Sequence, residues 1–81
     1  MSNDDVLVNE VTQWISKILR KEVDPSNLEA SLIDHYEADS MDIVEIVEMM
    51  ETKYGLNITN QEISQIQTIN DVLDKIKSSI V

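Results

Sequence analysis

The sequence predicts an all-α fold, a small four-helix bundle with three longer helices and one short helix. Apolar residues recur at helical spacing in three separate segments, and 81 residues are too few for a second hydrophobic core, so residues 1–81 are expected to form a single domain. Phe is absent and aromatic residues make up only 4% of the chain. The core is therefore expected to consist of Ile, Val, Leu and Met.

The first helix is expected over about residues 4–21. Its apolar residues fall at helical spacing: Leu7, Val11, Trp14, Ile15, Ile18 and Leu19. Acidic residues at its start and basic residues at its end suit the helix dipole. A long loop, residues 22–39, follows; it has no clean period and contains the only proline. Loops of this length are usually functional or pinned by their own apolar residues, here Val23, Leu28, Leu32, Ile33 and Tyr36.

The second helix is expected from Ser40 to Tyr54, capped by the Asp39 carboxylate and stopped by Gly55. A helical projection puts one group of residues on the core side, with Val44 at its edge: Ile43, Ile46, Val47, Met50 and Tyr54. The opposite arc is expected to face solvent and contains Met41, Asp42, Glu45, Glu48, Met49 and Thr52.

Two further helices are expected after Gly55. Asn60 is a candidate cap for a short helix over residues 60–65, and Thr68 caps the last helix. The last helix has an apolar stripe of Ile69, Val72, Leu73, Ile76 and Ile80. Because this part of the chain is rich in Ile and Val, a strand at 56–58 is the alternative.

Charge limits the possible partners. Sixteen acidic and six basic residues give a net charge of -10, and ten acids without any Lys or Arg lie between Glu22 and Thr52. This distribution predicts one acidic face that attracts partners with exposed Lys and Arg. It argues against nucleic acid and anionic membrane surfaces, which need a basic footprint. No apolar run approaches the length of a membrane span.

Several chemistries are excluded by composition and spacing. The chain has no Cys, so it has no disulfide, thiolate zinc site or thiol nucleophile. The segment DHYEADSMDIVE lacks the central glycine and ligand spacing of a calcium-binding EF-hand, and no intrinsic metal site is expected. The start MSNDDVL lacks the basic-then-apolar order of a signal peptide, so we expect a soluble, cytoplasmic protein.

Ser40 is the one residue placed as a reactive hydroxyl, with Asp39 before it and Asp42 two residues later. With His35 and Asp39 it could form a nucleophile–base–acid set in a small hydrolase, but such a bundle offers little oxyanion hole or substrate cleft. The alternative is a hydroxyl presented to another enzyme for modification. Met41 and Met49 lie among the carboxylates of the outer arc, an arrangement typical of a docking face. The alternative is that both are ordinary surface residues without a role in binding.

The segment ADSMDIVEIVEMMETKYGLNI resembles the modification-site segment of acyl carrier proteins, which has an Asp-Ser-Leu-Asp core opening an acidic second helix. The resemblance extends over nearly the whole chain, including SLID before the site and QTINDVLDKI as the last helix. It implies that Ser40 receives 4'-phosphopantetheine from coenzyme A through a separate phosphopantetheinyl transferase. Asp39 would contact that transferase's magnesium, and the family's recognition acids match Asp42, Glu45 and Glu51.

The resemblance implies a non-catalytic, monomeric carrier of acyl thioesters for fatty-acid or polyketide biosynthesis. Its partners would be acyl-transferring and ketosynthase-type enzymes with basic docking patches. The expected docking set is Asp39, Met41, Asp42, Glu45, Glu48, Met49 and Glu51. An aminoacyl or peptidyl carrier and an unmodified acidic interaction module are the alternatives.

The chain departs from the common family pattern at several positions. Tyr36 and Glu37 stand where Leu-Gly is common, and Met41 replaces the usual Leu. Glu48 replaces an apolar contact residue, while Thr52 and Lys53 replace acids. These departures bear on which enzymes the chain would serve more than on its modification.

Overall fold

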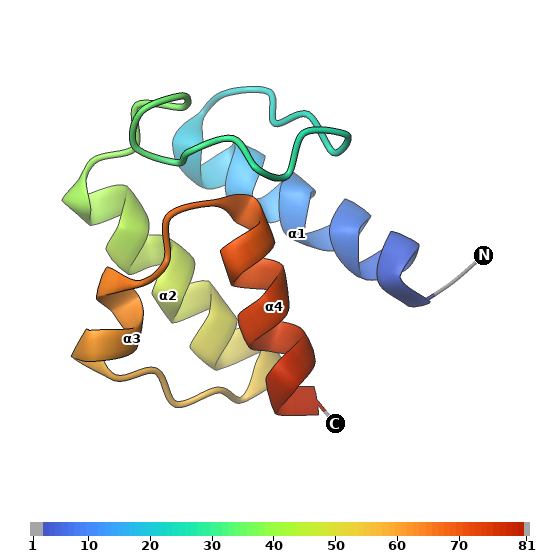
Figure 1. Cartoon of the computed structure of the whole chain (residues 1–81), viewed down its shortest axis with the longest axis vertical. Helices are drawn as coiled ribbons and strands as arrows, with labels where there is room; N and C mark the ends of the chain where they lie inside the picture. The colour runs from blue at the N-terminus through green and yellow to red at the C-terminus, as the bar shows by residue number, and fades with distance from the viewer. Residues whose placement is uncertain (1–2, 81) are drawn as a thin grey trace.

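The computed structural model describes residues 3–80 and contains four helices (Figure 1). They are α1 (Asn3–Leu19), α2 (Ser40–Tyr54), α3 (Asn60–Ser64) and α4 (Ile69–Ile80). A long loop joins α1 to α2 across one end of the molecule, and the short α3 lies beside α2 (Figure 1). Within the described residues, only an isolated bridge between Ser31 and Thr68 has β pairing. The all-α prediction is confirmed, and no strand forms at 56–58.

The core is built from the aliphatic residues that the sequence predicts. Its largest fully buried side chains are Val11, Ile15, Leu32, Ile46, Met50, Ile69, Val72, Leu73 and Ile76. Trp14 is also buried, and its Nε1 donates a hydrogen bond to the Tyr54 hydroxyl at 3.4 Å. Burial raises the pKa of the Tyr54 phenol; the bond from Trp14 opposes this rise and the nearby Glu10 carboxylate adds to it.

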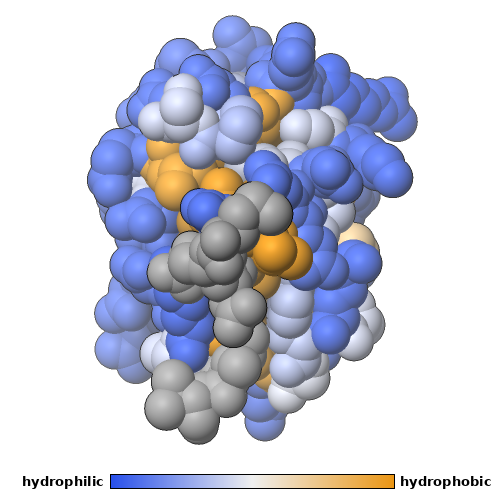
Figure 2. Space-filling view, turned by 90° about the vertical axis from the view of Figure 1, so that its right-hand side faces the viewer, coloured by the Kyte–Doolittle hydropathy of each residue, from blue (hydrophilic) through white to orange (hydrophobic). Residues whose placement is uncertain are grey.

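Polar side chains cover this core incompletely. Hydrophilic side chains cover most of the face shown in Figure 2, but apolar side chains are visible between them. Four large apolar side chains remain exposed in the described part of the chain: Val6, Ile33, Met41 and Val44. A chain of this size has too little polar surface to cover every apolar residue.

The end of α1 differs from the prediction, because the helix stops at Leu19 and not at about residue 21. Arg20 has φ 58°, in the left-handed region, and the Lys21 N–H donates to the Ser16 carbonyl at 3.2 Å. This is the Schellman arrangement that commonly closes a helix. Gly usually occupies the left-handed position, so the sequence offered no clear stop signal here.

The other helix ends follow the predicted capping chemistry with one correction. Asp39 caps α2, Gly55 ends it with φ 67°, and the Thr68 hydroxyl accepts a hydrogen bond from the Asp71 N–H. The cap of α3 is Thr59, not Asn60. The Thr59 hydroxyl accepts from the Glu62 N–H while the Glu62 carboxylate accepts from the Thr59 N–H, and this reciprocal pair fixes the helix start.

The long loop is pinned as expected, except at one residue. Val23, Leu32 and Tyr36 are buried, whereas Ile33 is 57% exposed and does not anchor the loop. Backbone hydrogen bonds attach the loop to the segment before α4 and to the first turn of α4. The Leu32 N–H donates to the Gln67 carbonyl, and the Asn70 N–H donates to the Leu28 carbonyl, both at 2.9 Å. The loop is thus held against the α3–α4 connection.

Glu37, three residues before Ser40, has φ 58°. It occupies the position at which the resembled family commonly has Gly, and a side chain in this left-handed region is strained. Lys21 supports the conformation: its Nζ donates to the Tyr36 carbonyl at 2.7 Å and lies 3.5 Å from a Glu37 carboxylate oxygen. The pair is largely exposed, so it contributes little to stability.

We therefore expect Glu37→Gly to raise the free energy of unfolding by up to about 1 kcal/mol, because relief of strain exceeds the entropy cost of glycine. Glu37→Val should lower it, since β-branched residues tolerate this conformation worst. Urea denaturation would measure both changes. Glu22→Gly, at an exposed loop residue outside the left-handed region, is the control and should only destabilise. If Glu37→Gly destabilises the protein as much as the control does, the backbone at Glu37 is not strained.

Candidate functional site

Ser40 is the first residue of α2, and a capping box fixes its surroundings. The Asp39 carboxylate accepts a hydrogen bond from the Asp42 N–H at 2.8 Å, and the Asp42 carboxylate accepts from the Asp39 N–H at 3.2 Å. Both carboxylates beside Ser40 therefore have a structural role at the helix start. Just before the cap, the Ala38 N–H donates to the Leu32 carbonyl at 2.9 Å, which holds the chain entering α2 against the pinned loop.

The Ser40 side chain is exposed, and its hydroxyl has no hydrogen bond to any other residue in the range 3–80. A hydroxyl in this position is accessible to an enzyme from outside. It also lies at the positive end of the α2 dipole, where negative charge is stabilised. The negative charges of Asp39 and Asp42 oppose part of that stabilisation.

No nucleophilic triad is assembled at Ser40. Within the described residues, His35 has no hydrogen bond to Ser40 or Asp39; its ring packs edge-on against Tyr36, with centroids 4.7 Å apart. The Asp39 carboxylate is used by the helix cap. Geometry therefore gives Ser40 no general base of its own, which removes the basis of the hydrolase interpretation.

The outer face of α2 carries three of the seven predicted docking residues. Met41 is 67% exposed, and Glu45 and Glu48 are exposed. Val44, which was expected at the edge of the core side, is 49% exposed and joins this face. Sequence projection missed it because a residue at the edge of a stripe is buried only if a neighbouring helix reaches it.

Three predicted docking residues are placed differently. Met49, expected to face solvent, is half-buried and packs against the core. Glu51 is half-buried, and its carboxylate accepts a hydrogen bond from the Ile58 N–H at 3.2 Å, which supports the chain after α2. Asp42 is also half-buried because it takes part in the cap. These side chains have structural roles that the sequence pattern did not indicate.

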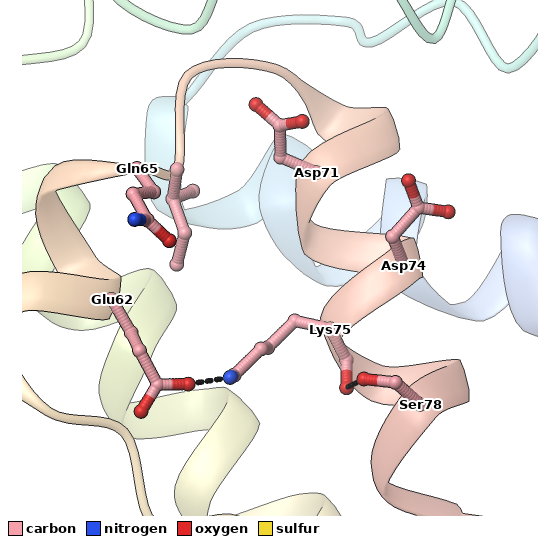
Figure 3. A pocket seen from close by; sticks show the side chains of 7 residues that line it. Glu62, Gln65, Asp71, Asp74, Lys75 and Ser78 are labelled. Carbon is pink, nitrogen blue, oxygen red and sulfur yellow. Dashed lines mark hydrogen bonds and ion pairs between the residues drawn. The ribbon is translucent and has the colours of Figure 1, made fainter.

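A hollow of about 330 Å³ lies between α3 and α4 and includes no residue of α2 (Figure 3). Its lining is Glu62, Gln65, Ile66, Asp71, Asp74, Lys75 and Ser78. Lys75 forms an ion pair with Glu62 across it (Figure 3). Since Ile66 is the one apolar residue in this lining, the hollow does not suit an acyl chain.

Two other features bear on function. No group of three or more His, Cys, Asp or Glu side chains within the described range is placed to hold a metal ion. No helix in that range is long and apolar enough to cross a membrane.

Comparison with known proteins identifies the family. The profile of the family described as "Phosphopantetheine attachment site" matches residues 9–76, which include Ser40. The acyl carrier proteins of Rickettsia canadensis (strain McKiel) and Rickettsia rickettsii (strain Iowa) are each 31% identical to the chain over 77 residues, covering 95% of this chain and 90% of theirs. The acyl carrier protein of Rickettsia prowazekii (strain Madrid E) is similar to the same extent.

The family match spans most of the chain. The four-helix fold of the chain and its exposed serine are compatible with the phosphopantetheine cofactor of that family. Enzymes that attach this cofactor and enzymes that use its cargo are the partners of such carriers. The chain therefore belongs to the phosphopantetheine-binding family of acyl carrier proteins, whose members carry acyl groups and are not enzymes.

Proposed function

We propose that Ser40 is the attachment site of 4'-phosphopantetheine and that residues 1–81 act as one monomeric carrier domain in the cytoplasm. The observation that carries this proposal is the exposed Ser40 hydroxyl at the capped start of α2. It has no competing hydrogen bond within the described residues and no base of its own, as suits a substrate of another enzyme.

Attachment requires an outside enzyme to supply the missing chemistry. Oγ of Ser40 forms a bond to the phosphorus of the pantetheine arm in coenzyme A, the nucleotide part leaves, and the serine proton passes to a base of the transferase. Asp39 lies next to the reacting hydroxyl and is proposed to contact the transferase's magnesium. The cofactor supplies the thiol that this Cys-free chain lacks, so acyl groups are carried as thioesters.

The proposed docking surface for the transferase and for biosynthetic enzymes is the outer face of α2. Its exposed members are Met41, Val44, Glu45 and Glu48. Carboxylates here steer partners with basic patches, and exposed apolar groups supply short-range contact. Acyl-transferring and ketosynthase-type enzymes of fatty-acid or polyketide synthesis are the proposed partners.

The proposal predicts a single modification of the wild-type chain. With coenzyme A, magnesium and a broad-specificity phosphopantetheinyl transferase, intact mass spectrometry should show the addition of one phosphopantetheinyl group, and fragmentation should place it on Ser40. No addition, or an addition mapped to a different serine, would contradict the assignment. Loading assays with acyl and aminoacyl donors then distinguish an acyl carrier from an aminoacyl carrier.

A further inference from the structure

We propose that a hollow between α1 and α2 receives one apolar side chain from a helix of a partner enzyme, flanked on that helix by Lys or Arg. The hollow has a volume of about 300 Å³ and is lined by Ile18 of α1 and by Glu45, Glu48, Met49 and Thr52 of α2. The inference rests on the proposed docking function of α2 and extends it, because it makes α1 part of the partner site.

Ile18 and Met49 form the apolar part of the hollow. Both side chains are half-buried and pack against the core, so each has one side in the protein interior and the other at the surface. Met49 adds a flexible, polarizable thioether, which adapts to apolar groups of different shape. The sequence projection did not anticipate this position of Met49 between the core and the solvent.

The rim of the hollow is acidic and its charges are uncompensated. The carboxylates of Glu45 and Glu48 are exposed, and neither forms an ion pair within the described residues. The Thr52 hydroxyl donates to the Glu48 carbonyl at 2.9 Å, so it does not engage the Glu48 carboxylate. An apolar surface beside two free carboxylates is complementary to an apolar side chain with cationic neighbours.

Volume and charge together favour a protein side chain over other occupants. Small-molecule sites range from about 300 to 1,000 Å³, so this hollow is at the lower limit for a free ligand. A second copy of the chain would bring another net charge of -10 to an acidic rim, which opposes self-association. The α3–α4 hollow differs because Lys75 already pairs with Glu62 there (Figure 3).

A defined peptide tests the proposal on the unmodified chain. The probe is a dye-labelled, alanine-rich helical peptide with one Leu and an Arg one turn before and one turn after it. We expect saturable binding by fluorescence anisotropy, weakened about five- to tenfold by Ile18→Ala and by Glu48→Gln. The Glu48→Gln variant should also show less salt dependence than wild type, whereas Ile18→Ala should keep the wild-type salt dependence.

Matched controls separate local from general effects. Glu29→Gln removes one negative charge from the long loop and keeps an oxygen to accept the hydrogen bond from Asn70, so peptide binding should stay near the wild-type value. A peptide with Leu replaced by Ala should bind much more weakly. If Ile18→Ala lowers the melting temperature, Glu48→Gln decides the outcome, because its side chain is exposed and outside the core.

Three results would overturn the inference. They are wild-type affinity in both Ile18→Ala and Glu48→Gln, equal binding of the Leu and Ala peptides, and self-association of the chain in sedimentation experiments that Ile18→Ala removes. Modification of Ser40 is measured separately by mass spectrometry. Failure of that modification with normal peptide binding would refute the proposed carrier site and leave the hollow supported.

Discussion

Ser40→Ala is expected to abolish phosphopantetheinylation completely while leaving the fold intact. The substitution removes the only atom to which the phosphorus can bond at this position. It removes no hydrogen bond within residues 3–80, because the Ser40 hydroxyl makes none there. Helix α2 keeps its start, since Asp39 and Asp42 form the capping box, and exposed changes usually alter stability by only about 0.5 kcal/mol.

The measurement is the intact mass after incubation with transferase, coenzyme A and magnesium, together with thermal unfolding of the same sample. Ser64→Ala is the matched control, because Ser64 is an exposed serine at the end of α3 and should not affect modification. An equal mass gain in Ser40→Ala and wild type would show that another residue is modified. If the Ser40→Ala variant loses both the modification and the fold, Ser40→Cys is the second substitution to be tested at this residue.

Charge reversal at Glu45 is expected to slow modification about tenfold at low salt, mainly through the association rate. Glu45 is exposed on the outer face of α2 and has no ion-pair partner within the described part of the chain, so the fold should stay nearly unchanged. The deficit should shrink as salt rises, because salt screens the lost attraction. Transferase kinetics across a salt series would measure it.

Asp74→Lys is the matched control for this reversal. It makes the same change in net charge at an exposed residue of α4, away from α2. Glu10 and Glu62 are unsuitable as controls, since Glu10 lies near the Tyr54 hydroxyl, while Glu62 accepts a hydrogen bond from the Thr59 N–H in the α3 capping box and pairs with Lys75. Met41→Ala should weaken docking with little salt dependence. If Asp74→Lys slows modification as much as Glu45→Lys, overall charge alone controls the rate.

Local sequence signals were sufficient for most of the fold. Periodicity located the three longer helices, and a polar residue after Ile58 indicated the short one; the caps at Asp39 and Thr68 and the stop at Gly55 were correct. These signals work because helix periodicity and capping depend on residues within one or two turns of each other. The end of α1 was predicted wrongly because Arg20 adopts the left-handed conformation, which Gly usually occupies after the last turn of a helix.

One part of the candidate site could also be predicted from local sequence, whereas the other part depends on packing. Ser40 with its flanking acids is a local pattern, so the sequence alone indicated the family and made Ser40 the candidate for modification. The docking face was only partly predictable, because exposure of a residue on α2 depends on which other segments cover it. Met49 and Glu51 were expected to face partners, and the structure uses both for contacts with the rest of the bundle.

The helical class, the aliphatic core, the acidic charge and the proposal of Ser40 as the modified residue all came from the sequence, since each follows from composition or from neighbours along the chain. Which apolar side chains remain at the surface, and which lie between two helices, depended instead on how the helices and loops pack together. Ile33 and Val44 are exposed because no described segment covers them, and Ile18 and Met49 line one hollow because α1 packs against α2. Such contacts join residues far apart in the chain, and no local pattern records them.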